Sequence, residues 1–256
     1  MCDQRSNARI LVIVGALATL IVVLASPPPA RAQLSNLYPG FFSYNSHEIS
    51  LVLFGGGYIS DQVGVTQEGF QLEQTITPYL GVFGRATGYQ LFVGNGFSNP
   101  LSQRESPSSR YNFGRLQGGV DFAIYPGSHL YISGGNDVGD SHSQLVEGDY
   151  NGWFMAHSPH PINVSFNMIQ DFENGVTSNE IDVRTVLLSS DRYLVLAGAG
   201  GAFFFGGRTD GGAGQGGPDV TVFYRPWQLG VATQFGYGSS RQYGEVTLFR
   251  QFSWSD

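Results

Sequence analysis

The chain has 256 residues, of which 41% are hydrophobic, 14% are aromatic and only 13% are charged, about half the roughly 25% of ordinary soluble domains. Thirteen arginines and no lysine stand against 20 acidic residues, so the formal net charge is −7. This acidic balance excludes nucleic acid as a partner, because phosphates require a basic footprint, and the low charge indicates that something other than water solvates the surface.

The first 32 residues are typical of a secretory signal peptide. Arg5 and Arg9 precede an apolar run at 10–25, and three prolines and the small-residue site Ala30-Arg31-Ala32 follow it. This order predicts cleavage before Gln33. The alternative is an uncleaved membrane anchor. The apolar run is shorter than the roughly 20 residues that a spanning helix needs, which favours cleavage over the anchor.

Cleavage there would leave 224 residues with ten arginines, nineteen acidic residues and a formal charge of −9. The single cysteine, Cys2, would be removed, so the mature chain would have neither a disulfide scaffold nor a thiolate metal site. We therefore expect no metal and no cofactor. Residues 33–46 are expected to form a periplasmic N-terminal extension, and residues 47–256 a single all-β unit.

Segments of alternating polarity run along the whole mature chain. The clearest segment, at 162–169, has Ile162, Val164, Phe166 and Met168 on one face and Asn163, Ser165 and Asn167 on the other. Residues 70–83, 180–187 and 219–225 alternate in the same way. A period of two with one apolar face predicts a strand between an apolar and a wet environment.

The connections between these segments fall into two alternating groups. Five short turns are predicted at 85–88, 125–128, 158–161, 189–192 and 225–227. Six mostly longer connections, rich in Gly, Ser, Asn and Asp, are predicted at 61–68, 95–109, 134–144, 171–178, 207–218 and 238–242. Short periplasmic turns that alternate with longer external loops are typical of a closed antiparallel outer-membrane barrel. They predict twelve strands, with ten or fourteen as alternatives.

Aromatic residues agree with this architecture. Seven of them lie close to a predicted short turn or to the chain end, where girdles flank the apolar band of such barrels; core aromatics of a soluble domain are the alternative. These residues are Tyr89, Tyr125, Tyr131, Trp153, Tyr193, Trp227 and Trp254.

Over nearly all of residues 47 to 254, the chain thus resembles a bacterial outer-membrane β-barrel. The resemblance implies an outer-membrane location, contact with outer-membrane lipid, and recognition by the barrel-insertion machinery through a terminal aromatic residue. Here Ser255 and Asp256 follow Trp254, which departs from that pattern. Arg250 falls on the apolar face, so we expect it to lie near the edge of the bilayer, where a cation is tolerated; the alternative is that the register or the lipid-facing side of this strand is assigned wrongly.

Alternation also predicts the residues that line the lumen. A polar lumen with both charge signs could form a narrow porin-like channel for small solutes, the favoured function. The same charges could instead pair and close the interior, leaving a structural or surface-binding barrel, and the extension at 33–46 could enter the periplasmic mouth. The predicted lining residues are Glu48, Glu73, Arg115, Asp121, His129, Glu180, Asp182, Arg184, Asp219, Arg225 and Glu245.

Two catalytic or nucleotide-binding interpretations are weaker. Outer-membrane barrels include lipid hydrolases with His and Ser near the outer rim, and His142 and Ser143 in the segment 139–143 are the nearest candidates. Adjacent strand residues face opposite ways, however, which disfavours an enzyme. The glycine-rich stretch 193–217 lacks a dinucleotide fingerprint, because Phe203 stands where the third glycine belongs. It instead predicts a ninth strand and an external loop.

Overall fold

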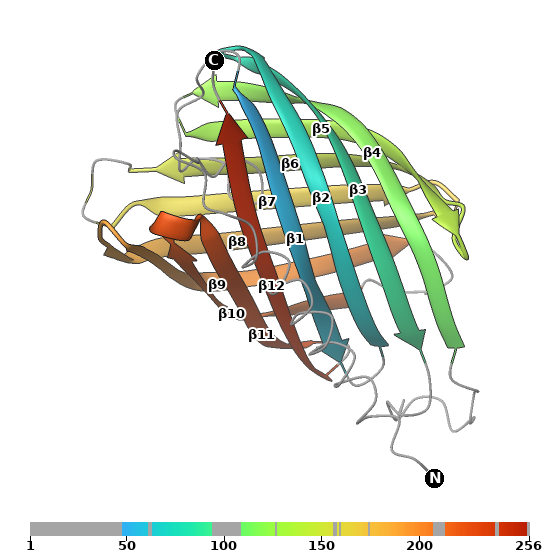
Figure 1. Ribbon diagram of the computed structural model, residues 1–256. Helices are drawn as coiled ribbons and strands as arrows, with labels where there is room; N and C mark the ends of the chain where they lie inside the picture. Colours follow the sequence, from blue (N-terminus) through green and yellow to red (C-terminus); the bar gives the residue numbers. More distant parts are fainter. Residues whose placement is uncertain are drawn as a thin grey trace.

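The structure, a computed structural model, describes residues 48–60, 63–93, 109–125, 127–155, 158, 160–173, 175–206, 213–238 and 241–254. The predicted signal peptide and the N-terminal extension to residue 46 lie outside these ranges. The described residues form twelve strands and one 3-10 helix (Figure 1). In chain order these are β1 (Ile49–Ser60), β2 (Val63–Thr77), β3 (Leu80–Val93), β4 (Ser109–Tyr125), β5 (Ser128–Gly139), β6 (Gln144–Phe154), β7 (Ile162–Asp171), β8 (Val176–Ser189), β9 (Tyr193–Gly206), β10 (Ala213–Tyr224), η1 (Arg225–Trp227), β11 (Leu229–Gly238) and β12 (Arg241–Trp254).

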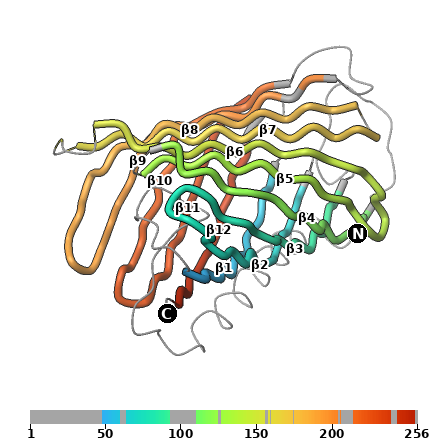
Figure 2. The backbone as a smooth tube through the Cα atoms, turned by 90° about the horizontal axis from the view of Figure 1, so that it is seen from above, coloured from blue at the N-terminus to red at the C-terminus, as the bar shows by residue number. Residues whose placement is uncertain are grey.

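The strands close into one antiparallel barrel in which every strand pairs with its neighbours in the chain. The seam pairs β1 with β12, from Ile49 opposite Trp254 to Ser60 opposite Tyr243. Closure removes the sheet edges whose unpaired backbone groups would be costly in lipid. In Figure 1 strands β1 to β4 slope across strands β7 to β10 behind them, as tilted barrel strands do, and Figure 2 shows the strands from above. The predicted twelve-stranded barrel is confirmed.

Both ends of the strand sequence, Ile49 and Trp254, lie at one end of the barrel, which we term the terminal end. The connections at this end span 78–79, 126–127, 155–161, 190–192 and 225–228, and those at the opposite, loop end span 61–62, 94–108, 140–143, 172–175, 207–212 and 239–240. The predicted contrast in length is therefore weaker than expected. Strands β2, β5 and β10 extend into stretches predicted as loops, because backbone pairing needs no apolar side chain.

The turn predicted at 85–88 is wrong. These residues lie inside β3, paired with both β2 and β4, and the chain turns at Pro78 and Tyr79 instead. Proline has no N–H to donate to a strand ladder, and the Tyr79 N–H donates to Thr77 Oγ1 at 3.2 Å. The error moved one turn along the chain but left the number of strands unchanged.

Strand alternation separates an apolar outer face from a polar inner face. On β7, Phe166 and Met168 are about 40% exposed on the outside, whereas Asn163 is 1% exposed inside. Strand β10 repeats this with Val222 outside and Thr221 inside. An apolar outer belt over a polar interior is stable in a bilayer. Within the described ranges, no helix is long and apolar enough to cross a membrane.

Candidate functional site in the barrel lumen

The inner surface is strongly acidic. Of the eleven residues predicted to line the lumen, all but Arg225 lie on the inner face. Arg225 lies in η1 at the terminal end, where its Nη2 donates to Ser189 Oγ at 3.2 Å, because the strand that was expected to carry it ends at Tyr224. Among the described residues, the inner face carries the acidic side chains Glu48, Glu73, Asp121, Asp137, Glu147, Asp149, Asp171, Glu180, Asp182, Asp219 and Glu245 and the arginines Arg85, Arg115 and Arg184.

The sequence did not indicate five charged residues of the inner face. Arg85 lies in a stretch predicted as a turn, and Asp137 and Asp171 lie in stretches predicted as loops, so strand alternation was not applied to them. Glu147 and Asp149 lie on β6, where glycines interrupt the outer apolar face and obscure the alternation. Val146 and Phe154, which both face outward, were the signal that could have set the register of this strand.

A cavity of about 360 Å³ crosses the lumen and is lined by side chains from nine strands. Six acidic residues line it, but only two arginines do. This volume lies within the roughly 300–1,000 Å³ of small-molecule pockets. The charged lining residues are Arg85, Glu147, Asp149, Glu180, Asp182, Arg184, Asp219 and Glu245.

Arg184 links two aspartates at the wall of this cavity. Its Nε donates to Asp219 Oδ1 at 2.8 Å, and its Nη2 lies 3.1 Å from Asp182 Oδ2. Ser165 also donates to Asp182 Oδ2, at 3.2 Å. The other carboxylate oxygens, Asp182 Oδ1 and Asp219 Oδ2, are buried without a hydrogen-bond partner among the described residues, as is Thr221 Oγ1. The guanidinium therefore satisfies one oxygen of each aspartate, and the second oxygen of each has no hydrogen-bond partner among the described residues.

The glycine-rich stretch supplies the space for this arrangement. β9 lies between β8 and β10, and Gly200 pairs with Asp182 in register. A β-carbon at Gly200 would overlap the Asp182 carboxylate and lie 2.6 Å from Gln234 Nε2. Tyr193–Gly206 is a strand, as predicted, and the predicted external loop begins at 207, outside the described residues.

A second polar network crosses the lumen at the wall of the same cavity. Arg85 Nε donates to Gln71 Oε1 at 2.7 Å, and its Nη1 lies 3.3 Å from Glu147 Oε1. Gln117 also donates to Glu147, and Asn167 does so at 2.7 Å. Because Arg85 lies on β3 and Glu147 on β6, this network joins strands that are not neighbours. The positive charge of Arg85 is therefore paired with the carboxylate of Glu147.

Arg115 and Asp137 form a bidentate pair on β4 and β5. Arg115 Nε and Nη2 donate to the two oxygens of Asp137 at 2.8 and 3.1 Å. The guanidinium also lies 5.3 Å from the ring centroid of Tyr89. Fork-to-fork geometry makes this a strong charge-assisted contact, and it neutralises one further acid of the inner face.

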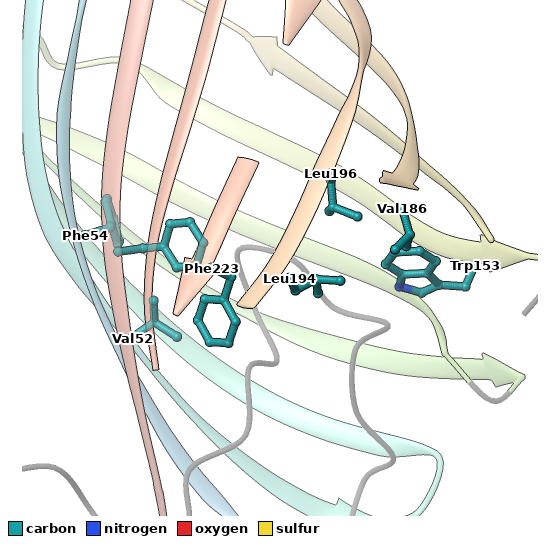
Figure 3. Close-up of a cluster of buried hydrophobic side chains, with 8 residues drawn as sticks. Val52, Phe54, Trp153, Val186, Leu194, Leu196 and Phe223 are labelled. Carbon is teal, nitrogen blue, oxygen red and sulfur yellow. The ribbon is translucent and has the colours of Figure 1, made fainter. Parts of the chain in front are cut away.

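Side chains fill the lumen toward the terminal end. An apolar cluster lies on the side formed by β6 to β12 and β1 (Figure 3). On the opposite side, His129 Nδ1 lies 3.2 Å from Asp121 Oδ2, and Tyr131 packs edge-on against Phe83. Side chains from both sides therefore occupy the terminal half. The apolar cluster comprises Val52, Phe54, Trp153, Val186, Leu194, Leu196, Phe223 and Phe249.

Three of the seven predicted girdle residues face inward. Tyr89 lines the cavity, and Tyr131 and Trp153 are buried in the lumen, so placing them in an outer girdle was wrong. Proximity to a turn sets the height of a residue in the barrel, but its strand parity sets the face.

The other girdle candidates face outward where their side chains are described. Tyr193, Trp227 and Trp254 are exposed near the terminal end, and the first two contact the ring of Tyr224 at centroid distances of 5.1 and 5.7 Å. The side chain of Tyr125 lies outside the described part of the chain. We propose that the three exposed residues form an interfacial girdle.

Three further residues discussed from the sequence can also be placed. Arg250 pairs with Leu229, the first residue of β11, so it lies near the terminal end, and its side chain is 2% exposed with the guanidinium 4.8 Å from the ring centroid of Phe252. His142 is exposed, whereas Ser143 is buried and donates to Asp171 at 3.1 Å. The two candidates for a catalytic pair therefore face apart.

Comparison with known proteins agrees with this geometry at the level of fold. An outer membrane channel from Pseudomonas putida F1 is similar over 85% of this chain and 100% of its own, with a TM-score of 0.54 and 9% identity. The β domain of the Bordetella autotransporter BrkA is similar over 81% of this chain and 100% of its own, with a TM-score of 0.51 and 10% identity. No protein-family model matches the sequence, and no curated protein matches it.

The closed barrel, its apolar outer belt and its polar lumen define the class of the protein. It has the fold of a bacterial outer-membrane β-barrel, with the apolar outer face that such a barrel presents to lipid.

Proposed function

We propose that the protein is a narrow channel for small solutes that prefers cations. The excess of acidic over basic side chains around the lumenal cavity carries this proposal. Charges that line a narrow pore set its ion preference, and low-dielectric walls focus their field. Cations would be concentrated in the cavity, and anions repelled from it.

The filled terminal half supplies the constriction of this channel. The apolar cluster on one side of this half resists hydration, and hydrophobic constrictions gate pores by dewetting. Passage through the lumen therefore requires the apolar cluster around Phe223 and Leu196 to rearrange. This feature equally favours a second candidate, a closed structural or surface-binding barrel that does not conduct.

Planar-bilayer recording separates the two candidates. The purified protein should give discrete conductance steps, and in a KCl gradient its reversal potential should shift toward the equilibrium potential of potassium. A reversal potential on the chloride side would contradict the cation preference. Absence of steps, together with no swelling of proteoliposomes in small sugars, would favour the closed barrel.

A further inference from the structure

We propose that the acidic cavity binds a small organic cation with two or more ammonium groups, which would be the solute class of the channel. This inference rests on the proposed function, because it names what that pore would admit. The proposal is based on two buried aspartates, Asp182 and Asp219, that share Arg184. Each aspartate keeps one carboxylate oxygen that no described residue satisfies with a hydrogen bond.

The unsatisfied atoms point to a hydrogen-bond donor. Asp182 Oδ1 and Asp219 Oδ2 accept no hydrogen bond from a described residue, and each residue is more than nine-tenths buried. Thr221, which is 2% exposed and also lines the cavity, has no hydroxyl partner within the described ranges. Buried acceptors are normally satisfied, so a ligand with several N–H groups fits this wall.

The charge of the cavity requires that the donor be cationic. Six acidic side chains face two arginines, and Arg85 is already paired with Glu147. Glu180 and Glu245 add two further carboxylates to the lining. Water could satisfy the hydrogen bonds but would leave the excess negative charge uncompensated, and an anion would increase it.

The spacing of the acids favours an extended organic cation over a metal ion. The carboxylates come from β6, β8, β10 and β12, around the cavity, and no group of three or more Asp, Glu or His among the described residues converges as metal ligands would. Ammonium groups joined by a flexible chain can reach separate carboxylates, and each carries three donors.

Calorimetric titration of the folded full-length barrel in detergent tests this inference. The probes are spermidine, 1,4-diaminobutane, butylamine and Mg²⁺, each at the same low ionic strength. Spermidine and the diamine should bind, and butylamine should bind at least about tenfold more weakly because it satisfies only one carboxylate. This comparison needs no variant and therefore does not depend on the folding of one.

Asparagine variants then locate the site. Asp182→Asn and Asp219→Asn keep the shape of each side chain but remove its charge, and each should weaken spermidine binding at least about tenfold. Glu173→Gln is the matched control, because it removes a carboxylate at the loop end, outside the lumen; binding should stay within about twofold. Heat-modifiable migration on a gel verifies that each variant is folded.

Several outcomes would overturn the inference. They are no binding of spermidine by the parent, equal binding of butylamine, equal affinity for Mg²⁺, or the same affinity in both aspartate variants as in Glu173→Gln. The proposed channel would survive any of these if cation-selective steps persisted in bilayers. Conversely, specific diamine binding without conductance would reject the channel but keep the site.

Discussion

Gly200 of β9 lies directly against the carboxylate of Asp182 on β8, so a β-carbon at position 200 would occupy the space of that side chain. The acidic wall of the cavity therefore depends on a residue that has no side chain. We expect Gly200→Ala to displace Asp182 and lower the free energy of unfolding by about 1–3 kcal/mol, as overpacking does. Denaturant unfolding of the folded barrel measures this change.

Gly148→Ala is the matched control for that substitution. Gly148 lies on the outer face of β6, and a β-carbon there would meet nothing within 4 Å. We expect a change within about 1 kcal/mol, toward greater stability, because alanine loses less chain entropy than glycine. Equal effects of the two substitutions would contradict the close approach at Gly200.

Truncating Phe223 should open the terminal constriction. Phe223 stacks on Phe249 with their ring centroids 6.2 Å apart, in the middle of the apolar cluster. Phe223→Ala should cost about 3–5 kcal/mol of stability, and should raise single-channel conductance at least about twofold by widening the dewetted region. Val222→Ala, on the outer face of the same strand, should leave conductance unchanged. An unaltered conductance in folded Phe223→Ala would show that the cluster is not the constriction.

Removing Arg85 should increase cation preference. In Arg85→Gln the carboxylate of Glu147 keeps its bonds from Gln117 and Asn167 but loses its ion pair with Arg85, so the lumen becomes more negative. The ratio of potassium to chloride permeability, measured from reversal potentials, should rise at least about twofold. Arg110→Gln provides the control, because Arg110 is exposed at the loop end. A fall in the ratio for Arg85→Gln would mean that the lumenal charge does not control selectivity.

The three tryptophans should report two different environments. Trp227 and Trp254 are exposed on the outer face, whereas Trp153 is buried in the lumen. Brominated lipids should quench the parent protein, and the loss of fluorescence should fall by at least about half in the double variant Trp227→Phe/Trp254→Phe, which retains Trp153 alone. Undiminished quenching in this variant would place Trp153 next to lipid and contradict the inward facing of β6.

The sequence predicts the barrel well because period-two alternation is a local property of each strand. Strand β7 shows this: its polar and apolar faces follow directly from the residues between Ile162 and Ile169. Turn positions were less predictable. The stretch Arg85–Gly88 is predicted as a turn, yet its single glycine, Gly88, is tolerated in a central strand, and Pro78 decides where the chain reverses.

The sequence predicts which side chains of the site face the lumen, but it does not predict which of them contact one another. Alternation assigned Asp182, Arg184 and Asp219 to the interior, where the structure places them. It could not show that Arg184 joins the two aspartates across β9, because that contact depends on the curvature of the barrel and on the absence of a side chain at Gly200. Pairings between strands that are not neighbours depend on closure, which no local pattern encodes.

The charged inner face has a consequence for assembly. If one strand slipped by a single residue against its neighbour, every side chain on it would exchange faces. On β8 such a slip would move Asp182 and Arg184 into hydrocarbon, where a charged residue costs about 2–4 kcal/mol near the bilayer midplane. The charged side chains that give the lumen its polarity therefore disfavour any slip of this strand by an odd number of residues.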